Sequence, residues 1–386
     1  MTCLYLFNRT IVNPEDIFFA EPAMLYKEYG STGKRISVIG CGGMRLPTPH
    51  DHAAGIAILH AARRAGINYF DTAPFYCDDQ SEAIFGEALR TMPPSPLPLY
   101  LSSKCSHANG ADFRRGLEKS LRRLGVPRID FFHIWCVMDA ADWQARLRGG
   151  ALRAALRAKE EGLIGHICVS AHMSGPEIED MIRQHPEIEG LTLGSNAINF
   201  PYRQQGVTAA HRHHRGVVAM NPLGGGIIPQ HPAAFDFIRS PDDPDVVTAA
   251  LRFLISDPAI TSALIGFHSL EEVAAAVRAV EQFAPYPPTH LDAIRRRLTS
   301  DFNEMCTGCG YCLPCPAGIP IPRLMDIHNL MQLGATDRAI HDRFQNHWEL
   351  TPAQAADCIA CGQCESRCTQ HLPIIQRLKK IAAFPL

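Results

Sequence analysis

The sequence predicts an α/β protein, in which a barrel of eight alternating strands and helices is followed by a small α-rich domain dense in cysteine. Two observations lead to this prediction. Short apolar runs alternate with amphipathic stretches over residues 36–283, and eight cysteines lie in two short runs near the C-terminus. A chain of 386 residues, 46% hydrophobic and 20% charged, is long enough for one large domain and one small one.

Eight apolar or β-branched runs have the length of buried strands, with helical periodicity between them. The predicted strands are 36–40, 68–71, 99–104, 129–135, 166–170, 191–200, 216–221 and 262–266. The predicted helices include 52–65, 81–90, 111–124, 151–161 and 270–283. Asp112 and Ser269 are candidate N-caps. Eight such units in about 250 residues are typical of the (β/α)8 or TIM barrel, whose active sites lie at the C-terminal ends of the strands.

The two cysteine runs have the spacing of metal ligands, C-x2-C-x2-C-x2-C and C-x2-C-x2-C-x3-C. Three closely spaced thiolates can bind one cubane, and in two-cluster ferredoxins the fourth ligand comes from the distant run. The spacing therefore predicts two [4Fe-4S] clusters. The ligands are Cys306, Cys309, Cys312 and Cys368 for one cluster, and Cys358, Cys361, Cys364 and Cys315 for the other.

Zinc is the alternative metal, because paired C-x2-C knuckles also form tetrahedral thiolate sites. Three consecutive short spacings fit zinc poorly, since a zinc site usually draws two ligands from each knuckle. The first run ends with two intervening residues instead of three, and Thr369 follows Cys368 where proline is usual. Neither departure removes a ligand.

The composition gives no sign of a nucleic-acid or membrane partner, because the formal net charge is only −2. Glu15 and Asp16 stand where a signal peptide would be apolar, and no apolar run approaches the roughly 20 residues that cross a bilayer. We therefore expect a cytoplasmic protein. In that reducing compartment its fourteen cysteines would serve as ligands or free thiols.

The same features suggest four segments. Residues 1–23 are expected to be an N-terminal extension, 24–283 the barrel, the proline-rich stretch 284–300 a linker, and 301–386 the cluster domain.

Specific residues follow the second and third predicted strands. INYFDTAPFY places Asp71 and Tyr76 after the second strand, and LYLSSKC places Lys104 at the end of the third. Together with GLIGHICVSAH, NPLGGG and ALRFLISDPAITSALIGFHSLEEV, these motifs closely resemble the aldo-keto reductase family. The C-terminal part resembles the two-cluster ferredoxin-like module that is fused to one branch of that family.

The resemblance implies that Tyr76, Lys104 and Asp71 are catalytic. Reduction of a carbonyl by a nicotinamide needs an acid that protonates the oxygen as hydride arrives at carbon. A tyrosine has a reference pKa of about 10 and can serve if a nearby cation favours its phenolate. Lys104 would be that cation, and Asp71 would hold Lys104 as its ion-pair partner.

The family also has a histidine five residues after the aspartate of the fourth strand, but here Asp130 plus five is Trp135. An indole donates one N–H and does not exchange a proton near neutral pH, so Trp135 could orient a carbonyl but could not tune the reaction. His133, two residues earlier, is expected to be a core residue deeper in the barrel, and His107 is a weaker candidate donor.

The resemblance assigns nucleotide contacts as well. Ser170 and Asn196 stand where family members bind the nicotinamide carboxamide, although Asn196 replaces the usual glutamine and Ala171 the usual asparagine. Gly224, Gly225 and Gly266 are candidates for backbone contact with the nucleotide.

Glu272 stands where many members have an arginine for the 2′-phosphate. We therefore expect NAD(H) to be the nicotinamide cofactor, with NADPH disfavoured by the carboxylate.

Four further cysteines, Cys41, Cys77, Cys105 and Cys136, lie at the mouth ends of the first four strands. Lys104 and Trp135 should face the barrel axis. Alternation along a strand is therefore expected to turn Cys105 and Cys136 toward the outer helices, where they would be small buried residues.

These observations predict an iron–sulfur oxidoreductase of aldo-keto reductase type. It would couple a nicotinamide or carbonyl-type small-molecule substrate in the barrel to one-electron transfer through two clusters, with ferredoxin or another redox protein as partner. The alternative is a catalytically impaired barrel that acts as an electron-transfer or scaffold subunit. The residues that favour this alternative are Trp135, Ala171, Met220 and Glu272.

Overall fold

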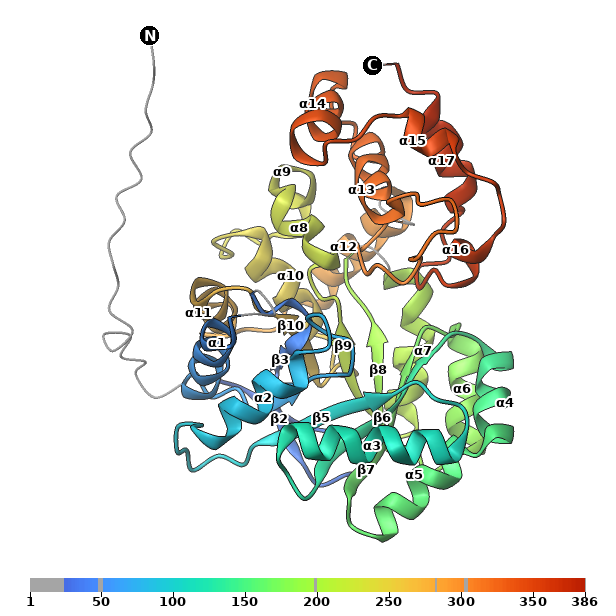
Figure 1. Cartoon of the computed structure of the whole chain (residues 1–386). Coiled ribbons are helices and arrows are strands. Elements are labelled where there is room, and N and C mark those ends of the chain that lie inside the picture. The colour runs from blue at the N-terminus through green and yellow to red at the C-terminus, as the bar shows by residue number, and fades with distance from the viewer. Residues whose placement is uncertain (1–23, 48–50, 198–199, 282, 302–304, 386) are drawn as a thin grey trace.

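The structure is a computed structural model that describes residues 24–47, 51–197, 200–281, 283–301 and 305–385. In these residues, eight parallel strands close into a barrel in the order β10-β3-β4-β5-β6-β7-β8-β9 (Figure 1). The strands are β3 (Ile39–Gly42), β4 (Tyr69–Asp71), β5 (Tyr100–Cys105), β6 (Ile129–Val137), β7 (Ile164–Ala171), β8 (Gly190–Gly194), β9 (Gly216–Met220) and β10 (Ser262–Gly266). The predicted (β/α)8 barrel is confirmed. β8 ends earlier than the predicted strand 191–200, whose residues 198–199 lie outside the described part.

Helices alternate with the strands and cover the barrel (Figure 1). They are α1 (His52–Arg64), α2 (Ser81–Arg90), α3 (Gly110–Leu124), α4 (Ala140–Gly149), α5 (Ala151–Glu160), α6 (Gly175–Gln184), α7 (Phe200–Arg212), α8 (Ile227–Gln230), α9 (Pro232–Phe235), α10 (Val246–Ile255) and α11 (Leu270–Arg278). Ser269 caps α11 as predicted, since its side chain accepts from the N–H of Glu272. For α3 the cap is Asn109 instead of Asp112, because the helix begins before the predicted start.

A short antiparallel hairpin, β1 (Tyr26–Glu28) and β2 (Arg35–Ser37), precedes the barrel. Tyr29 lies between its strands and is fully buried against Gly190 and Gly216, where any Cβ would overlap the tyrosine ring. Gly190 and Gly216 begin β8 and β9, so Tyr29 fills the N-terminal end of the barrel. The opposite end, where the strands finish, is left for the site.

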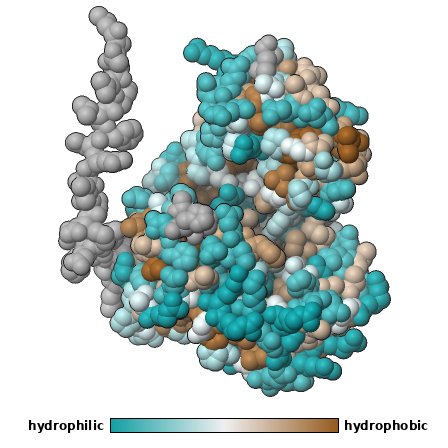
Figure 2. All heavy atoms as spheres, viewed as in Figure 1, coloured by the Kyte–Doolittle hydropathy of each residue, from teal (hydrophilic) through white to brown (hydrophobic). Residues whose placement is uncertain are grey.

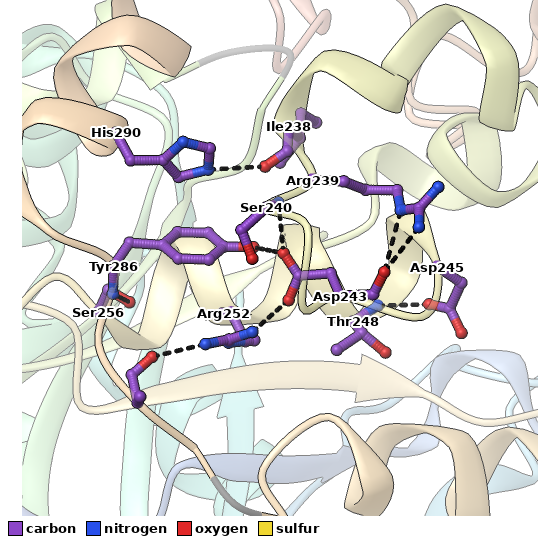
Figure 3. Close-up of polar contacts among 11 residues, drawn as sticks. Ile238, Arg239, Ser240, Asp243, Asp245, Thr248, Arg252, Ser256, Tyr286 and His290 are labelled. Atoms are coloured by element: carbon purple, nitrogen blue, oxygen red, sulfur yellow. Dashed lines mark hydrogen bonds and ion pairs between the residues drawn. The ribbon is translucent and has the colours of Figure 1, made fainter.

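The segment 284–300, predicted to be a linker, packs with the barrel. It contains most of α12 (Pro288–Asp301), whose Leu291, Ile294 and Leu298 belong to the same hydrophobic core as the barrel helices. Figure 3 shows how its start is anchored: the Tyr286 hydroxyl and the Arg252 guanidinium both donate to the carboxylate of Asp243. These hydrogen bonds satisfy the buried carboxylate of Asp243 and fix the place where the chain leaves the barrel.

The C-terminal module is α-rich, as predicted. Its helices are α13 (Ile321–Gln332), α14 (Asp337–Asp342), α15 (Ala353–Ala356), α16 (Gln363–Ser366) and α17 (Ile374–Ala382), with a π-helical turn at Arg343–His347. The module has its own hydrophobic core, to which Cys364 and Cys368 belong. In Figure 2 it forms a separate lobe above the barrel. No helix among the described residues is long and apolar enough to cross a bilayer.

Two contacts place the module on the mouth of the barrel. The buried Arg203 of α7 donates to the carbonyl oxygens of His172 and Met173 after β7 and, at 2.8 Å, to that of Thr369 in the module. His371 lies 3.2 Å from the carbonyl of His172 through its Nε2. The segment that directly follows Cys368 therefore covers the C-terminal ends of the barrel strands.

Candidate active site at the barrel mouth

Asp71 and Lys104 meet inside the barrel because they lie on the adjacent strands β4 and β5. Nζ of Lys104 lies 2.5 Å from Oδ1 of Asp71, and both side chains are 2% exposed. Lys104 also donates to the carbonyl of Thr72 at 2.9 Å, and the Ser102 hydroxyl donates to Oδ2 of Asp71 at 2.6 Å. The ion pair expected from the sequence is therefore present and rigidly held.

Tyr76 lies beside this pair, in the turn that follows β4. Nζ of Lys104 is 5.3 Å from the centroid of its ring. Burial, followed by Tyr311 and Asp71, raises the pKa of the Tyr76 phenol well above its usual value. The predicted lowering by Lys104 is not found, because Asp71 compensates the ammonium charge and burial opposes the phenolate. Tyr76 therefore stays protonated near neutral pH, which is the form that a proton donor needs.

Trp135 lies against Tyr76 with the ring centroids 5.7 Å apart and the planes nearly perpendicular. It is thus at the mouth, where the missing imidazole was expected. His133 on the same strand is fully buried, and burial together with Lys104 lowers its pKa well below the usual value. His133 is a core residue, as predicted.

The two cysteines that were predicted to face outward behave differently. Cys105 does so: its sulfur packs against Gly116 of α3. At Cys136 the register of β6 against β7 shifts and φ is +60°, so the alternation is interrupted. The Cys136 thiol lies close enough to raise the pKa of both Tyr76 and Tyr311. A bulge next to a site redirects side chains in this way, and alternation alone does not predict it.

A cavity of about 450 Å³ opens above Asp71 and Tyr76. Its roof comes from the module, through Cys309, Tyr311 and Thr369. The sequence analysis did not identify Tyr311 as a site residue. The sequence shows that Tyr311 lies between two predicted cluster ligands, but no local pattern indicates that the module folds over the barrel mouth.

His172, directly after β7, was also missed and lines the same cavity. It is 3% exposed, and its Nδ1 has no hydrogen-bond partner among the described residues. Burial and the neighbouring Arg203 and His371 lower the pKa of His172 well below the usual value. The site therefore contains a neutral imidazole, although not at the position that the resemblance implied.

The predicted nucleotide residues divide into two groups. Gly225, Gly266 and Glu272 line the cavity. Ser170 and Asn196 are buried and are not among the cavity-lining residues, and the Asn196 amide donates to the carbonyl of Asn221 at 2.7 Å.

Two further features bear on nucleotide binding. Gly225, next to the buried Gly224, has φ of +74°, and a Cβ there would overlap the carbonyl of Thr307, so this glycine permits close packing of the module. Arg45 lines the cavity together with Glu272, and its side chain packs on Gly266. The sequence analysis did not identify this cation.

Several thiols of the module lie close together. Cys315 lines one cavity together with Cys358, Cys361 and Cys364, and Cys312, which the sequence analysis assigned to the other set, lines it too. In the other set, burial raises the pKa of Cys306, and Cys309, Cys368 and Cys312 raise it further by their proximity. In the part of the chain that the structure describes, no three histidine, cysteine or acidic side chains converge as one metal ion requires.

Comparison with known families matches both parts of the chain. The sequence profile of the aldo/keto reductase family matches residues 38–296. This chain belongs to the aldo/keto reductase family. A profile for a 4Fe-4S dicluster domain matches residues 305–372. The protein is therefore an oxidoreductase of aldo/keto reductase type that carries a 4Fe-4S dicluster domain.

Individual relatives cover the barrel. An L-galactose dehydrogenase from Arabidopsis thaliana is 24% identical in an alignment 290 residues long that covers 66% of this chain and 87% of the relative. A pyridoxal 4-dehydrogenase from Microbacterium luteolum is 24% identical in an alignment 320 residues long that covers 66% of this chain and 93% of the relative. The holo form of an aldo-keto reductase from Bacillus halodurans has a TM-score of 0.61 at 20% identity and covers 71% of this chain and 96% of that one. At this identity the structural likeness shows the fold alone.

Proposed function

We propose that the protein couples the redox chemistry of a nicotinamide or carbonyl-type substrate in the barrel to one-electron transfer through two [4Fe-4S] clusters. One observation carries the proposal: Cys309, a ligand assigned to the first cluster, lines the same cavity as Tyr76 and Asp71. An ordinary reductase needs no such neighbour, because hydride passes directly from nicotinamide to substrate.

The barrel residues would act on a carbonyl oxygen. Tyr76, protonated at neutral pH, would donate a hydrogen bond and then a proton to that oxygen. Lys104, paired with Asp71, would position the turn that carries Tyr76 through its hydrogen bond to the carbonyl of Thr72, since Asp71 compensates the charge that would otherwise favour the phenolate. The clusters, when bound, would exchange two electrons one at a time with the nicotinamide, which would carry both to or from the carbonyl carbon as a hydride, while Tyr76 would supply or accept the proton on oxygen.

We propose Cys306, Cys309, Cys312 and Cys368 as ligands of the cluster next to the cavity, and Cys358, Cys361, Cys364 and Cys315 as ligands of the other. Part of the second set lies at the protein surface: Cys361 is exposed, and Ile359, next to Cys358, is 66% exposed, whereas Cys364 is buried. A ferredoxin or another one-electron carrier could approach there. The two relatives are named as dehydrogenases, which is compatible with electron flow in either direction.

For the nucleotide we propose NADH over NADPH. Glu272 lines the far part of the cavity, where its Oε2 accepts from the His268 N–H at 2.7 Å. A carboxylate there would repel a 2′-phosphate, and Arg45 would offset part of that repulsion. Ser170, Asn196, Gly224, Gly225 and Gly266 remain proposed contacts for the cofactor.

Rapid mixing of the anaerobic holoprotein would test the coupling. Cluster absorbance should fall on addition of NADH or reduced ferredoxin and recover on addition of an aldehyde. Tyr76→Phe should slow the recovery and leave reduction by ferredoxin intact, since the phenol is not a proposed cluster ligand and none of the second set of ligands, where ferredoxin would approach, lines its cavity. Aldehyde turnover with NADH at constant cluster absorbance would contradict the proposal.

A scaffold or electron-transfer subunit is the second candidate. Trp135 in the mouth and the strongly raised pKa of Tyr76 favour it, because both weaken acid catalysis. In that case reduced ferredoxin would still reduce the clusters, and neither nucleotides nor aldehydes would change their absorbance.

A further inference from the structure

Tyr311 reaches the barrel site from the cluster module. It lies in CTGCGYC, between Cys309 and Cys312. Gly308 and Gly310, on either side of Cys309, have φ of +63° and +80°, a conformation that glycine adopts without strain. The loop can therefore turn tightly at Cys309, and both Cys309 and Tyr311 line the cavity.

The Tyr311 ring contacts the barrel. It meets the ring of His172 edge to face, with the centroids 6.3 Å apart. Tyr311 also lines the cavity together with Tyr76 and Asp71.

The cavity is therefore lined by two phenols, those of Tyr76 and Tyr311. Each phenol can donate one hydrogen bond through its O–H. Trp135 is not among the residues that line the cavity, so Tyr311 provides a donor that the indole does not.

The position of Tyr311 is fixed by the docking of the module. The guanidinium of Arg203 joins the end of β7 to Thr369, and Gly225 packs closely on Thr307, four residues before Tyr311. Arg203 is 1% exposed, so this link is shielded from water and salt. These two contacts fix the module on the barrel and therefore also fix the position of Tyr311.

We propose that Tyr311 is a substrate-binding residue of the barrel site: its hydroxyl, together with that of Tyr76, hydrogen-bonds the oxygen of a carbonyl substrate, a task that the family resemblance gives to an imidazole. The active site is then assembled from two domains. This proposal rests on the proposed function only for the carbonyl class of the substrate, and it is independent of electron transfer.

Binding of benzaldehyde and toluene to the oxidised holoprotein tests the proposal without any reductant. The two probes have the same ring, and only benzaldehyde offers an oxygen. Tyr311→Phe should lower the preference for benzaldehyde by about threefold to tenfold, the effect of one lost hydrogen bond. Tyr311→His, which keeps an N–H donor, should retain more of the preference than Tyr311→Phe. Ligand-detected NMR measures both affinities.

Tyr26→Phe is the matched control, since it removes a phenol hydroxyl that donates to the carbonyl of Gly66, away from the cavity. Iron content must stay equal in all variants, because Tyr311 adjoins two proposed ligands. An unchanged preference in Tyr311→Phe would overturn the proposal, and so would tighter binding of benzaldehyde, which would mean that Tyr311 blocks the site. Failure of the proposed function is distinguishable: the preference would stand while cluster absorbance stayed constant in the redox experiment.

Discussion

The barrel and the cluster module are held together in different ways. The barrel closes a ring of eight strands through backbone hydrogen bonds and surrounds it with long amphipathic helices. The module has short helices, and its core includes Cys364 and Cys368, which are proposed metal ligands. A domain whose core contains its ligands gains folding free energy from the metal. The difference indicates that the barrel folds on its own contacts, whereas the module depends on its clusters.

Removal of iron should produce the largest difference in stability between the barrel and the module. The holoprotein should contain about eight irons per chain, from two four-iron clusters. After anaerobic chelation the module should become sensitive to protease while a fragment spanning the barrel and α12 survives, as mass spectrometry of the digest would show. Equal resistance of both regions would contradict the comparison.

Cys315→Ser should damage the cluster held by the second run and leave part of the iron in place. Cys77→Ser is the matched control, because its sulfur contacts the carbonyl of Gly43 in the barrel. Stoichiometric zinc without acid-labile sulfide would show that the cluster assignment is wrong.

The barrel site can be changed without altering the module. Trp135→His should raise aldehyde reduction by about 10²–10³, equivalent to roughly 3–4 kcal/mol, because an imidazole would be an additional positioned donor beside Tyr76. Tyr76→Phe in the same background should abolish the gain. Steady-state kcat/KM for a simple aldehyde measures both. Background turnover in a folded, nucleotide-binding Trp135→His variant would favour the scaffold.

The contact between the two regions depends on Arg203. Arg203→Met removes a buried cation from the carbonyls of His172, Met173 and Thr369, at a cost of about 3 kcal/mol to docking. Calorimetry should then resolve two thermal transitions, one for the barrel and one for the module, whereas the wild type is expected to melt in a single transition. Gln230→Ala, which loses one exposed hydrogen bond with Arg343 across the same interface, should change little. Similar melting of both variants would show that Arg203 does not hold the module.

The smallest expected effect concerns the nucleotide. Glu272→Gln removes one negative charge from the cavity and should improve NADPH binding about fivefold relative to NADH, as expected for one solvent-screened charge pair. Arg45→Gln should shift the preference in the opposite direction. Fluorescence titration of both nucleotides measures the ratio, and an unchanged ratio in Glu272→Gln would place the 2′-phosphate elsewhere.

The sequence was sufficient for the barrel and for the ion pair. Strand–helix alternation predicted the architecture. The motifs that resemble the aldo-keto reductase family predicted that Asp71 would pair with Lys104, and the structure contains this ion pair. The assignment of Cys315 to the second run, which rests on cysteine spacing, stays a prediction.

The features that the sequence did not predict depend on chain segments that meet only in three dimensions. The stretch 284–300 reads as a linker because of its prolines, yet Tyr286 and α12 are fixed by the barrel. The pKa of Tyr76 depends on burial and on Asp71 and Tyr311, whose field outweighs the predicted effect of Lys104. Cys136 lies where the register of β6 shifts, so the alternation of side chains along a strand does not predict its direction.

By itself, then, the sequence determined the fold class and the family, since these depend on periodicity and on short motifs. Only the tertiary structure decided that the cluster module covers the barrel mouth and brings Tyr311 to Tyr76. The physical reason is that this arrangement depends on a buried guanidinium and on a glycine that permits close packing, contacts between residues more than 80 positions apart.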